Sequence, residues 1–106
     1  MLQKITGQHQ NDENGNPAGG TTKGVGISIS WQDGPLGRGP TRREPTGAFV
    51  EGVIAAAIDR LEFYQASKFK CRENSLAITK LQEALHWMVH RTIDRETRSV
   101  EGVHAE

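Results

Sequence analysis

Residues 53–101 contain neither proline nor glycine. These two residues interrupt α-helices more than any others, so a stretch of this length without them predicts long helices. At its start, apolar residues recur every three or four positions and form one stripe, which is typical of a helix with a buried face. We predict a helix over residues 47–66, with Thr46 as its N-cap. The stripe consists of Phe49, Val50, Val53, Ile54, Ala57, Ile58 and Leu61.

A second apolar stripe predicts a longer helix that begins near Cys71 or Arg72 and continues toward Arg98. The bend between the two helices has to lie within Gln65–Phe69, and a connection this short joins antiparallel helices. We therefore expect a helical hairpin. The second stripe consists of Leu76, Ile78, Leu81, Leu85 and Met88, flanked by Ala77 and Ala84.

The second predicted helix is roughly 25 residues long, or about 38 Å at the rise of an α-helix, and the first is shorter. The far end of the longer helix carries Trp87, Met88 and Val89 and extends past its partner within the chain. Apolar side chains in such a position need cover. We expect another subunit to supply it, with the N-terminal sheet contributing.

Before the helices, apolar and small residues alternate over residues 26–31, which predicts a half-buried strand. A strand needs a partner, and we expect Leu2–Thr6 in this role, with Leu36–Arg38 as the alternative. Residues 7–24 are rich in Gly, Asn and Gln and nearly free of large apolar side chains, so they predict a loop. Residues 36–45 are basic and contain two prolines, and they predict a second loop.

The predicted fold class is α+β, a small irregular antiparallel sheet followed by an antiparallel two-helix hairpin with a long second helix. The boundary falls near residue 46: residues 1–46 hold the Gly-rich loop and the sheet, residues 47–106 hold the hairpin, and together they form one compact unit. Only 35% of the 106 residues are hydrophobic. Such a deficit indicates either disordered stretches or a fold completed by association of subunits.

Charge and cysteine content exclude several classes of protein. Thirteen basic and 13 acidic residues give a net charge of zero, so we expect no general DNA binding. The single cysteine, Cys71, rules out an internal disulfide and fits a reducing compartment. The N-terminus lacks an apolar signal core, and no apolar run is long enough for a membrane span. We expect a soluble intracellular protein.

Arg91 and Arg95 lie four residues apart on the second predicted helix, one turn after Trp87. Two guanidinium groups one turn apart suit a pair of phosphates, because each presents a planar fork of donors. The alternative is ordinary surface ion pairing with Asp94, which is common on helices.

The predicted loop over residues 36–45 carries a cluster of arginines that could also reach a ligand phosphate. The alternative is that these arginines are simply solvated. The cluster consists of Arg38, Arg42 and Arg43.

Glu83, His86 and His90 resemble half of a helical metal site. The first helix lacks the matching carboxylates and histidine, so packing or interface roles are favoured for both histidines and we expect no metal. The chain contains no P-loop, dinucleotide fingerprint, nucleophile elbow or Cys-x-x-Cys motif. We therefore predict no cofactor and no enzymatic activity.

Residues 71–104 (CRENSLAITKLQEALHWMVHRTIDRETRSVEGVH) resemble the helical-hairpin domain of phage proteins that counter bacterial Thoeris and CBASS immunity. Ile58–Gln65 is also similar to that family. Ser30–Pro35 is similar to its anti-Thoeris branch, which has extra N-terminal strands. The resemblance covers roughly residues 25–104.

The resemblance implies sequestration of an immune signal in the cytoplasm of the infected bacterial host. Members of this family bind cyclic ADP-ribose isomers made by Thoeris TIR proteins, and some also bind cyclic di- or trinucleotides of CBASS. They hold the signal without cleaving it. Their assemblies are homodimers, or hexamers formed as trimers of dimers.

The resemblance also implies ligand contacts in the hairpin. Arg91 and Arg95 match arginines that contact ligand phosphates. Asn74 matches an asparagine at the adenine, and Tyr64 lies where an aromatic ring stacks on that base. Tyrosine replaces phenylalanine there, which stacking tolerates.

Two further contacts are implied in the N-terminal half. Asp33 matches an acidic residue beside a ribose, and Arg42 or Arg43 matches an arginine of a loop.

The spacing of these residues constrains the assembly. Asn74 and Arg91 are 17 positions apart on one predicted helix, which is about 25 Å along its axis. A small nucleotide cannot reach both in one chain. We therefore expect them to meet across a two-fold dimer, with two equivalent pockets.

Two other functions remain open. A dimeric helical interaction module, such as a small phage adaptor or repressor, would bind a partner without using Arg91 or Arg95. A hydrolase or metal enzyme would use Glu83, His86 and His90.

Overall fold

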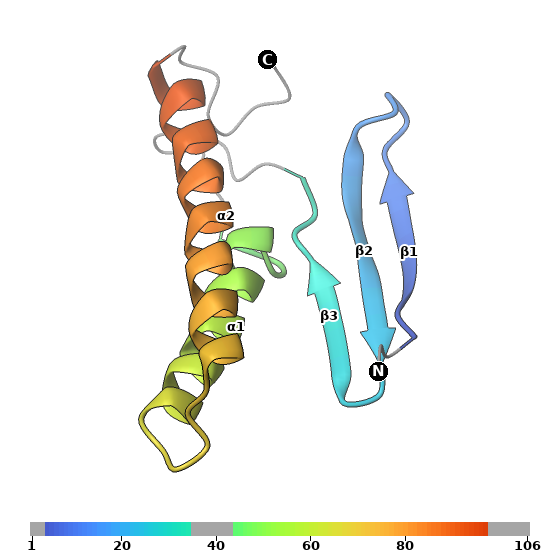
Figure 1. The fold of residues 1–106 in the computed structure, drawn as a ribbon. Coiled ribbons are helices and arrows are strands. Elements are labelled where there is room, and N and C mark those ends of the chain that lie inside the picture. Colours follow the sequence, from blue (N-terminus) through green and yellow to red (C-terminus); the bar gives the residue numbers. More distant parts are fainter. Residues whose placement is uncertain (1–3, 35–43, 98–106) are drawn as a thin grey trace. The chain divides into compact units, whose positions relative to one another are not determined.

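The computed structural model describes residues 4–34 and 44–97, and it divides the chain into two units (Figure 1). The described part of the first unit is a β-sheet region over residues 4–34 and 44–49, and the second unit is a helical hairpin over Val50–Thr97. The predicted α+β class is confirmed. In chain order the elements are β1 (Thr6–Asn11), β2 (Pro17–Gly24), β3 (Ile27–Trp31), α1 (Val50–Gln65) and α2 (Arg72–Thr97).

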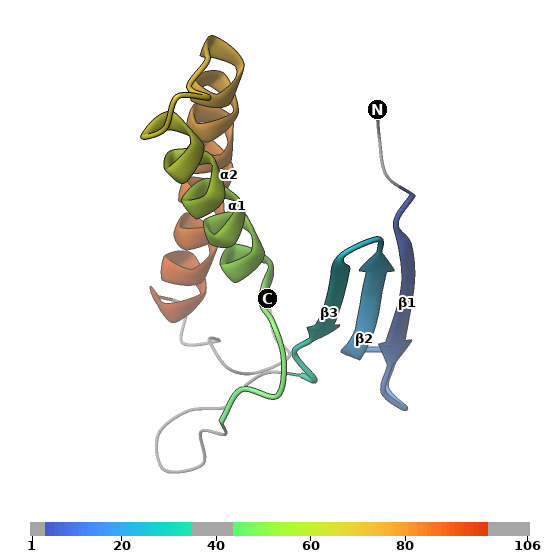
Figure 2. The same cartoon turned by 90° about the horizontal axis from the view of Figure 1, so that it is seen from below.

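The sheet is a meander of three antiparallel strands in the order β1-β2-β3 (Figure 2). Thr6 pairs with Lys23 at one end of β1, and Ile27 pairs with Gly24 at the start of β3. A cross-strand bond fastens β3 to β2, because the Trp31 indole Nε1 donates to the Thr22 hydroxyl at 2.7 Å. The predicted strand over residues 26–31 is thus confirmed as β3.

The prediction of a loop over residues 7–24 is wrong, because β1 and β2 form a hairpin there. Its turn is closed by polar groups: the Asp12 carboxylate accepts hydrogen bonds from the backbone nitrogens of Asn14 at 2.8 Å and Asn16 at 3.0 Å. Neither β1 (TGQHQN) nor β2 (PAGGTTKG) has alternating apolar residues, and every residue of β1 is exposed. Periodicity therefore gave no signal for them.

The expected partner of β3 is also wrong. β3 pairs with β2, whereas Thr6, the last residue of the predicted partner Leu2–Thr6, starts β1. The alternative partner, Leu36–Arg38, lies outside the described residues.

The chain returns beside β3 at Ala48, which forms an isolated parallel bridge with Trp31. Gln32 holds this return, because its side-chain oxygen accepts from the backbone nitrogens of Thr46 at 2.8 Å and Gly47 at 3.3 Å. The approach is so close that a Cβ on Gly47 would lie 2.6 Å from the Ser30 carbonyl oxygen. Glycine is therefore required at this crossing.

Thr46 is not the N-cap of α1, contrary to prediction. The helix begins at Val50, and the Thr46 hydroxyl instead accepts a hydrogen bond from the backbone nitrogen of Asp33 at 3.1 Å. Backbone hydrogen bonds of Ala48 with Ser30 and Gln32 keep the chain around Ala48 extended, so α1 begins only at Val50.

The hairpin has a long second helix, as predicted. α2 has 26 residues and α1 has 16, so α2 exceeds α1 by about 15 Å. Of the residues that the structure describes, only Ile58 is buried. Trp87 is 66% exposed and Ile93 is 55% exposed, so the far half of α2 leaves large apolar side chains uncovered within its own chain.

The predicted bend is confirmed, and side chains hold it. The side-chain amide of Gln65 forms two hydrogen bonds with the backbone of Cys71. Its oxygen accepts from the Cys71 nitrogen at 2.9 Å, and its nitrogen donates to the Cys71 carbonyl oxygen at 3.1 Å. Ser67 adds a second clamp, because its hydroxyl donates to the Tyr64 carbonyl at 2.6 Å and accepts from the Phe69 nitrogen at 3.0 Å. These bonds replace helix bonds that end at the turn.

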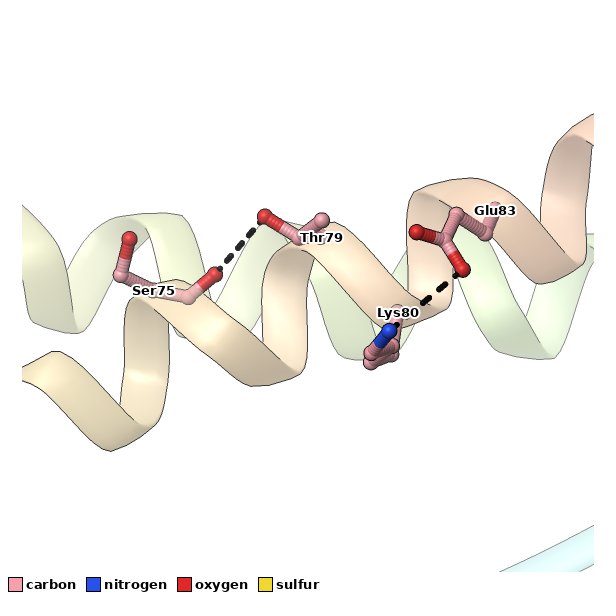
Figure 3. Close-up of polar contacts among 4 residues, drawn as sticks. All are labelled: Ser75, Thr79, Lys80 and Glu83. Carbon is pink, nitrogen blue, oxygen red and sulfur yellow. Dashed lines mark hydrogen bonds and ion pairs between the residues drawn. The ribbon is translucent and has the colours of Figure 1, made fainter.

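Polar contacts along α2 stay local (Figure 3). The Thr79 hydroxyl donates to the Ser75 carbonyl at 3.2 Å, and Lys80 pairs with Glu83 at 3.8 Å on an exposed face. Such pairs stabilise a helix by only a few tenths of a kcal/mol. Across residues 4–34 and 44–97, neither helix is long and apolar enough to cross a membrane.

Gly20→Ala should destabilise the sheet, because Gly20 has φ +137 and an added Cβ would lie 2.4 Å from the Gln8 carbonyl oxygen. We expect a loss of about 1–3 kcal/mol in the free energy of unfolding. Gly52→Ala is the control: Gly52 lies in α1 with open space around it, so alanine should stabilise by up to about 1 kcal/mol. Thermal unfolding by circular dichroism at one protein concentration measures both, and equal shifts would contradict the assignment.

Gln65→Ala should loosen the hairpin turn, because it removes both bonds to Cys71. We expect a loss of about 1–2 kcal/mol in the free energy of unfolding. Gln82→Ala on the exposed face of α2 is the matched control, expected within about 0.5 kcal/mol of the parent. Urea unfolding monitored at 222 nm compares the two, and an unchanged Gln65→Ala midpoint would show that the turn does not depend on this side chain.

Candidate functional site

An aromatic cluster lies on the last turns of α1. The Arg60 guanidinium carbon lies over the rings of Phe63 at 5.1 Å and Tyr64 at 4.9 Å from their centroids. Arg60 Nε also donates to the Tyr64 hydroxyl at 3.2 Å. The two rings are tilted by 56° with centroids 6.2 Å apart. The cluster therefore consists of two aromatic rings set at an angle, with one cation over both of them.

Asn74 lies on the first turn of α2, on the other side of the bend from Tyr64. Its side-chain nitrogen donates to the Phe69 carbonyl at a long 3.4 Å. Its backbone nitrogen donates to the Cys71 thiol sulfur at 3.4 Å, so Cys71 serves as a weak cap of α2. The amide oxygen of Asn74 accepts no hydrogen bond from the described residues. It can therefore accept a hydrogen bond from a ligand amine.

The turn brings Tyr64 and Asn74 to the same end of the hairpin. The clamps of Gln65 and Ser67 fix the backbone between them. A partly exposed aromatic ring at the same end of the hairpin as a side-chain amide is suited to a purine, because the ring can stack on the base and the amide can read its edge.

Arg91 does not join this end. It lies 17 positions after Asn74 on the same continuous helix, Arg72–Thr97, which separates the two by about 25 Å. Arg91 is exposed and makes no ion pair with any carboxylate whose side chain is described. Arg95 follows one turn later in α2, and its side chain lies outside the described part of the chain.

A shallow depression runs along the exposed side of α2 next to Trp87. The indole meets His86 and His90 edge-on, with ring centroids 6.0 Å and 5.7 Å away. All of the lining belongs to one helix, so the depression is open to solvent within the described part of the chain. The lining consists of Thr79, Gln82, Glu83, His86 and Trp87.

The half metal site at Glu83, His86 and His90 gathers no further ligand. Among the side chains that the structure describes, no three of His, Cys, Asp or Glu come together as a metal site. Glu83 pairs with Lys80, and the histidines contact Trp87.

The predicted contacts of the N-terminal half belong to the sheet unit. Asp33 follows β3 and is exposed, and its backbone is fixed by Thr46. Arg42 and Arg43 lie outside the described residues.

Sequence reasoning missed Arg60. It precedes Phe63 by three residues and Tyr64 by four, which are the spacings at which helix side chains meet. A search for a cation at those spacings from the aromatic pair would have found it.

Known proteins match the hairpin directly. The family model described as Acb2/Tad1, hairpin domain, matches residues 25–92, which hold β3, α1 and most of α2. The protein Thoeris anti-defense 1 of Bacillus phage SBSphiJ7 is 47% identical over 77 residues, which are 73% of this chain and 51% of that protein. The chain thus spans about half the length of the curated relative it matches. These matches confirm the predicted resemblance, and the chain belongs to the Acb2/Tad1 hairpin-domain family.

Proposed function

We propose that this protein binds a cyclic ADP-ribose-type immune signal and sequesters it without cleavage, and thereby inhibits Thoeris defence in the cytoplasm of the infected bacterium. The observation that carries the proposal is the 47% identity to a Thoeris anti-defense protein. The hairpin that matches the family also carries the stacking ring, the amide and the arginines that such a ligand requires.

The chemistry of the hairpin fits a molecule that combines adenine with phosphates. Stacking on an aromatic ring such as that of Tyr64 contributes about 1–3 kcal/mol per base. The Asn74 amide gives the site an edge-reading group, and Arg91 with Arg95 supplies charge-assisted hydrogen bonds to phosphate oxygens, each worth about 1.5–3 kcal/mol. Cyclic di- and trinucleotides offer the same groups and form a second ligand class for this site.

Each of these groups recognises a ligand without attacking it. Aromatic rings, amides and guanidinium groups stack on bases and neutralise charge, and none of them is a nucleophile or a general base at neutral pH. A site built from them holds the signal intact, so the expected effect on the host is a fall in the concentration of free signal.

A second copy of the chain completes the proposed site. We call the end of the hairpin that carries Tyr64 and Asn74 the base-binding end. Along α2, Asn74 of this end lies about 25 Å from Arg91. The helix also leaves Trp87 and Ile93 uncovered. Two helices that cross antiparallel cover these side chains and bring Arg91 of one subunit to Asn74 of the other. The two-fold arrangement contains two equivalent pockets, and the assembly is a dimer or a trimer of dimers.

Incubation with cyclic ADP-ribose isomers should lower the free signal in stoichiometric amounts, and heating should release it unchanged, as measured by mass spectrometry. Arg91→Ala should weaken binding at least 10-fold, because a buried phosphate loses its partner. Lys80→Ala removes one charge from the same helix at a position paired only with Glu83 and should bind like the parent.

Recovery of a cleaved product would identify an enzyme. Absence of binding to any isomer or cyclic oligonucleotide, with Arg91→Ala silent, would support the second candidate, a helical interaction module, which the uncovered apolar side chains of α2 favour.

Mixing two defective variants should restore binding if the pocket is shared between subunits. Tyr64→Ala with Asn74→Ala removes the base-binding end, and Arg91→Ala with Arg95→Ala removes the phosphate end. After unfolding and refolding together in equal amounts, half of the dimers are mixed, and each has one intact pocket. We expect about one quarter of the parent's ligand capacity by calorimetry, with sedimentation velocity confirming dimers or larger assemblies. Zero capacity in fully mixed dimers would place both ends of the ligand in one subunit.

A further inference from the structure

We propose that Arg60 is a positioning residue of the base-binding end: its side chain holds the Tyr64 ring in one orientation and covers one of the two ring faces. The inference rests on the proposed function, since it assigns a role within the site that receives the adenine. Neither the residues matched to the family's ligand contacts nor the relatives assign a role to Arg60.

The contacts of Arg60 all point to Tyr64 and its neighbour. The guanidinium lies over the Tyr64 ring at 4.9 Å, and Nε donates to the hydroxyl of the same ring at 3.2 Å. Phe63 backs the guanidinium from the adjacent position at 5.1 Å. No carboxylate among residues 4–34 and 44–94 forms an ion pair with Arg60. Among the described residues, the Arg60 guanidinium therefore interacts with Phe63 and Tyr64 and with no carboxylate.

Two simultaneous contacts fix the ring better than either alone. The cation on the face sets the tilt of the Tyr64 ring, and the hydrogen bond sets the position of its hydroxyl. A partly exposed ring such as that of Tyr64 samples several rotamers when nothing holds it, and ordering it on binding costs affinity. A ring that is already held stacks on a base at a smaller entropic cost.

The same contacts restrict where the base can stack. A guanidinium over one face of Tyr64 leaves only the opposite face for an adenine. The ring is then placed between a cation and a base. Stacking on one face only reduces the number of orientations that the ligand can adopt, which favours reading of the base edge by the Asn74 amide at the same end of the hairpin.

A double-mutant cycle tests this role. Arg60→Met keeps the length of the side chain and removes its charge and donor, and we expect it to weaken binding of cyclic ADP-ribose about 3- to 10-fold in the parent. In a Tyr64→Ala background the same substitution should have no effect, because the ring that it positions is gone. Lys68→Met is the matched control: it removes a charge that lies over Phe69 at 5.6 Å and should leave the affinity within 2-fold.

Two outcomes of the cycle would overturn the inference. Unchanged affinity of Arg60→Met in the parent means that the ring needs no support. An equal loss in the parent and in Tyr64→Ala means that Arg60 contacts the ligand itself, as a phosphate-binding residue does.

A ligand-free measurement separates this inference from the proposed function. Tyr64 is the chain's only tyrosine, so its aromatic NMR signals are unambiguous. We expect cross-relaxation between Arg60 side-chain protons and the Tyr64 ring, and a change in the ring shifts in Arg60→Met. Their absence overturns the inference even where the protein binds the signal. If they are present and no cyclic ADP-ribose isomer binds, the proposed function fails, and the contact is left as a structural one.

Discussion

The helical hairpin has a very small core within the described part of the chain. Ile58 is the single buried side chain among the described residues, while Trp87 and Ile93 remain more than half exposed. A domain that buries so little apolar surface gains too little free energy to offset its conformational entropy. In the proposed dimer, the long second helix is a surface for association as well as an element of the fold. In that proposed dimer, association both stabilises the chain and completes its binding site.

Unlike the core of the hairpin, its turn is stabilised by hydrogen bonds between residues close together in the sequence. Gln65 forms hydrogen bonds with both backbone groups of Cys71, and the Ser67 hydroxyl forms hydrogen bonds with the backbones of Tyr64 and Phe69. These bonds need no partner chain, so the base-binding end is organised within one subunit. The proposed site thus combines a rigid end made locally with an arginine end supplied by assembly.

The sequence predicted the hairpin well because apolar spacing is a strong signal over many turns. The stripe around Ile58, the bend after Gln65 and the length of α2 were all recoverable from it. The sheet was harder, because β1 and β2 are polar strands fixed by a turn around Asp12 and by backbone pairing. Such strands carry no alternation, and a glycine-rich segment looks the same whether it pairs or not.

The residues of the candidate site divide in the same way. Tyr64 and Asn74 came from resemblance, whereas Arg91 was also indicated by its spacing of one helical turn from Arg95. The distance between Asn74 and Arg91 was a physical result. The resemblance assigned no ligand contact to Arg60, which was found from its contacts with Phe63 and Tyr64. If the ligand bridges two subunits as proposed, its binding and the association of the chains are linked. Ligand that binds only the assembled form stabilises that form in proportion to the logarithm of its concentration. A rising immune signal would then tighten the assembly that removes it.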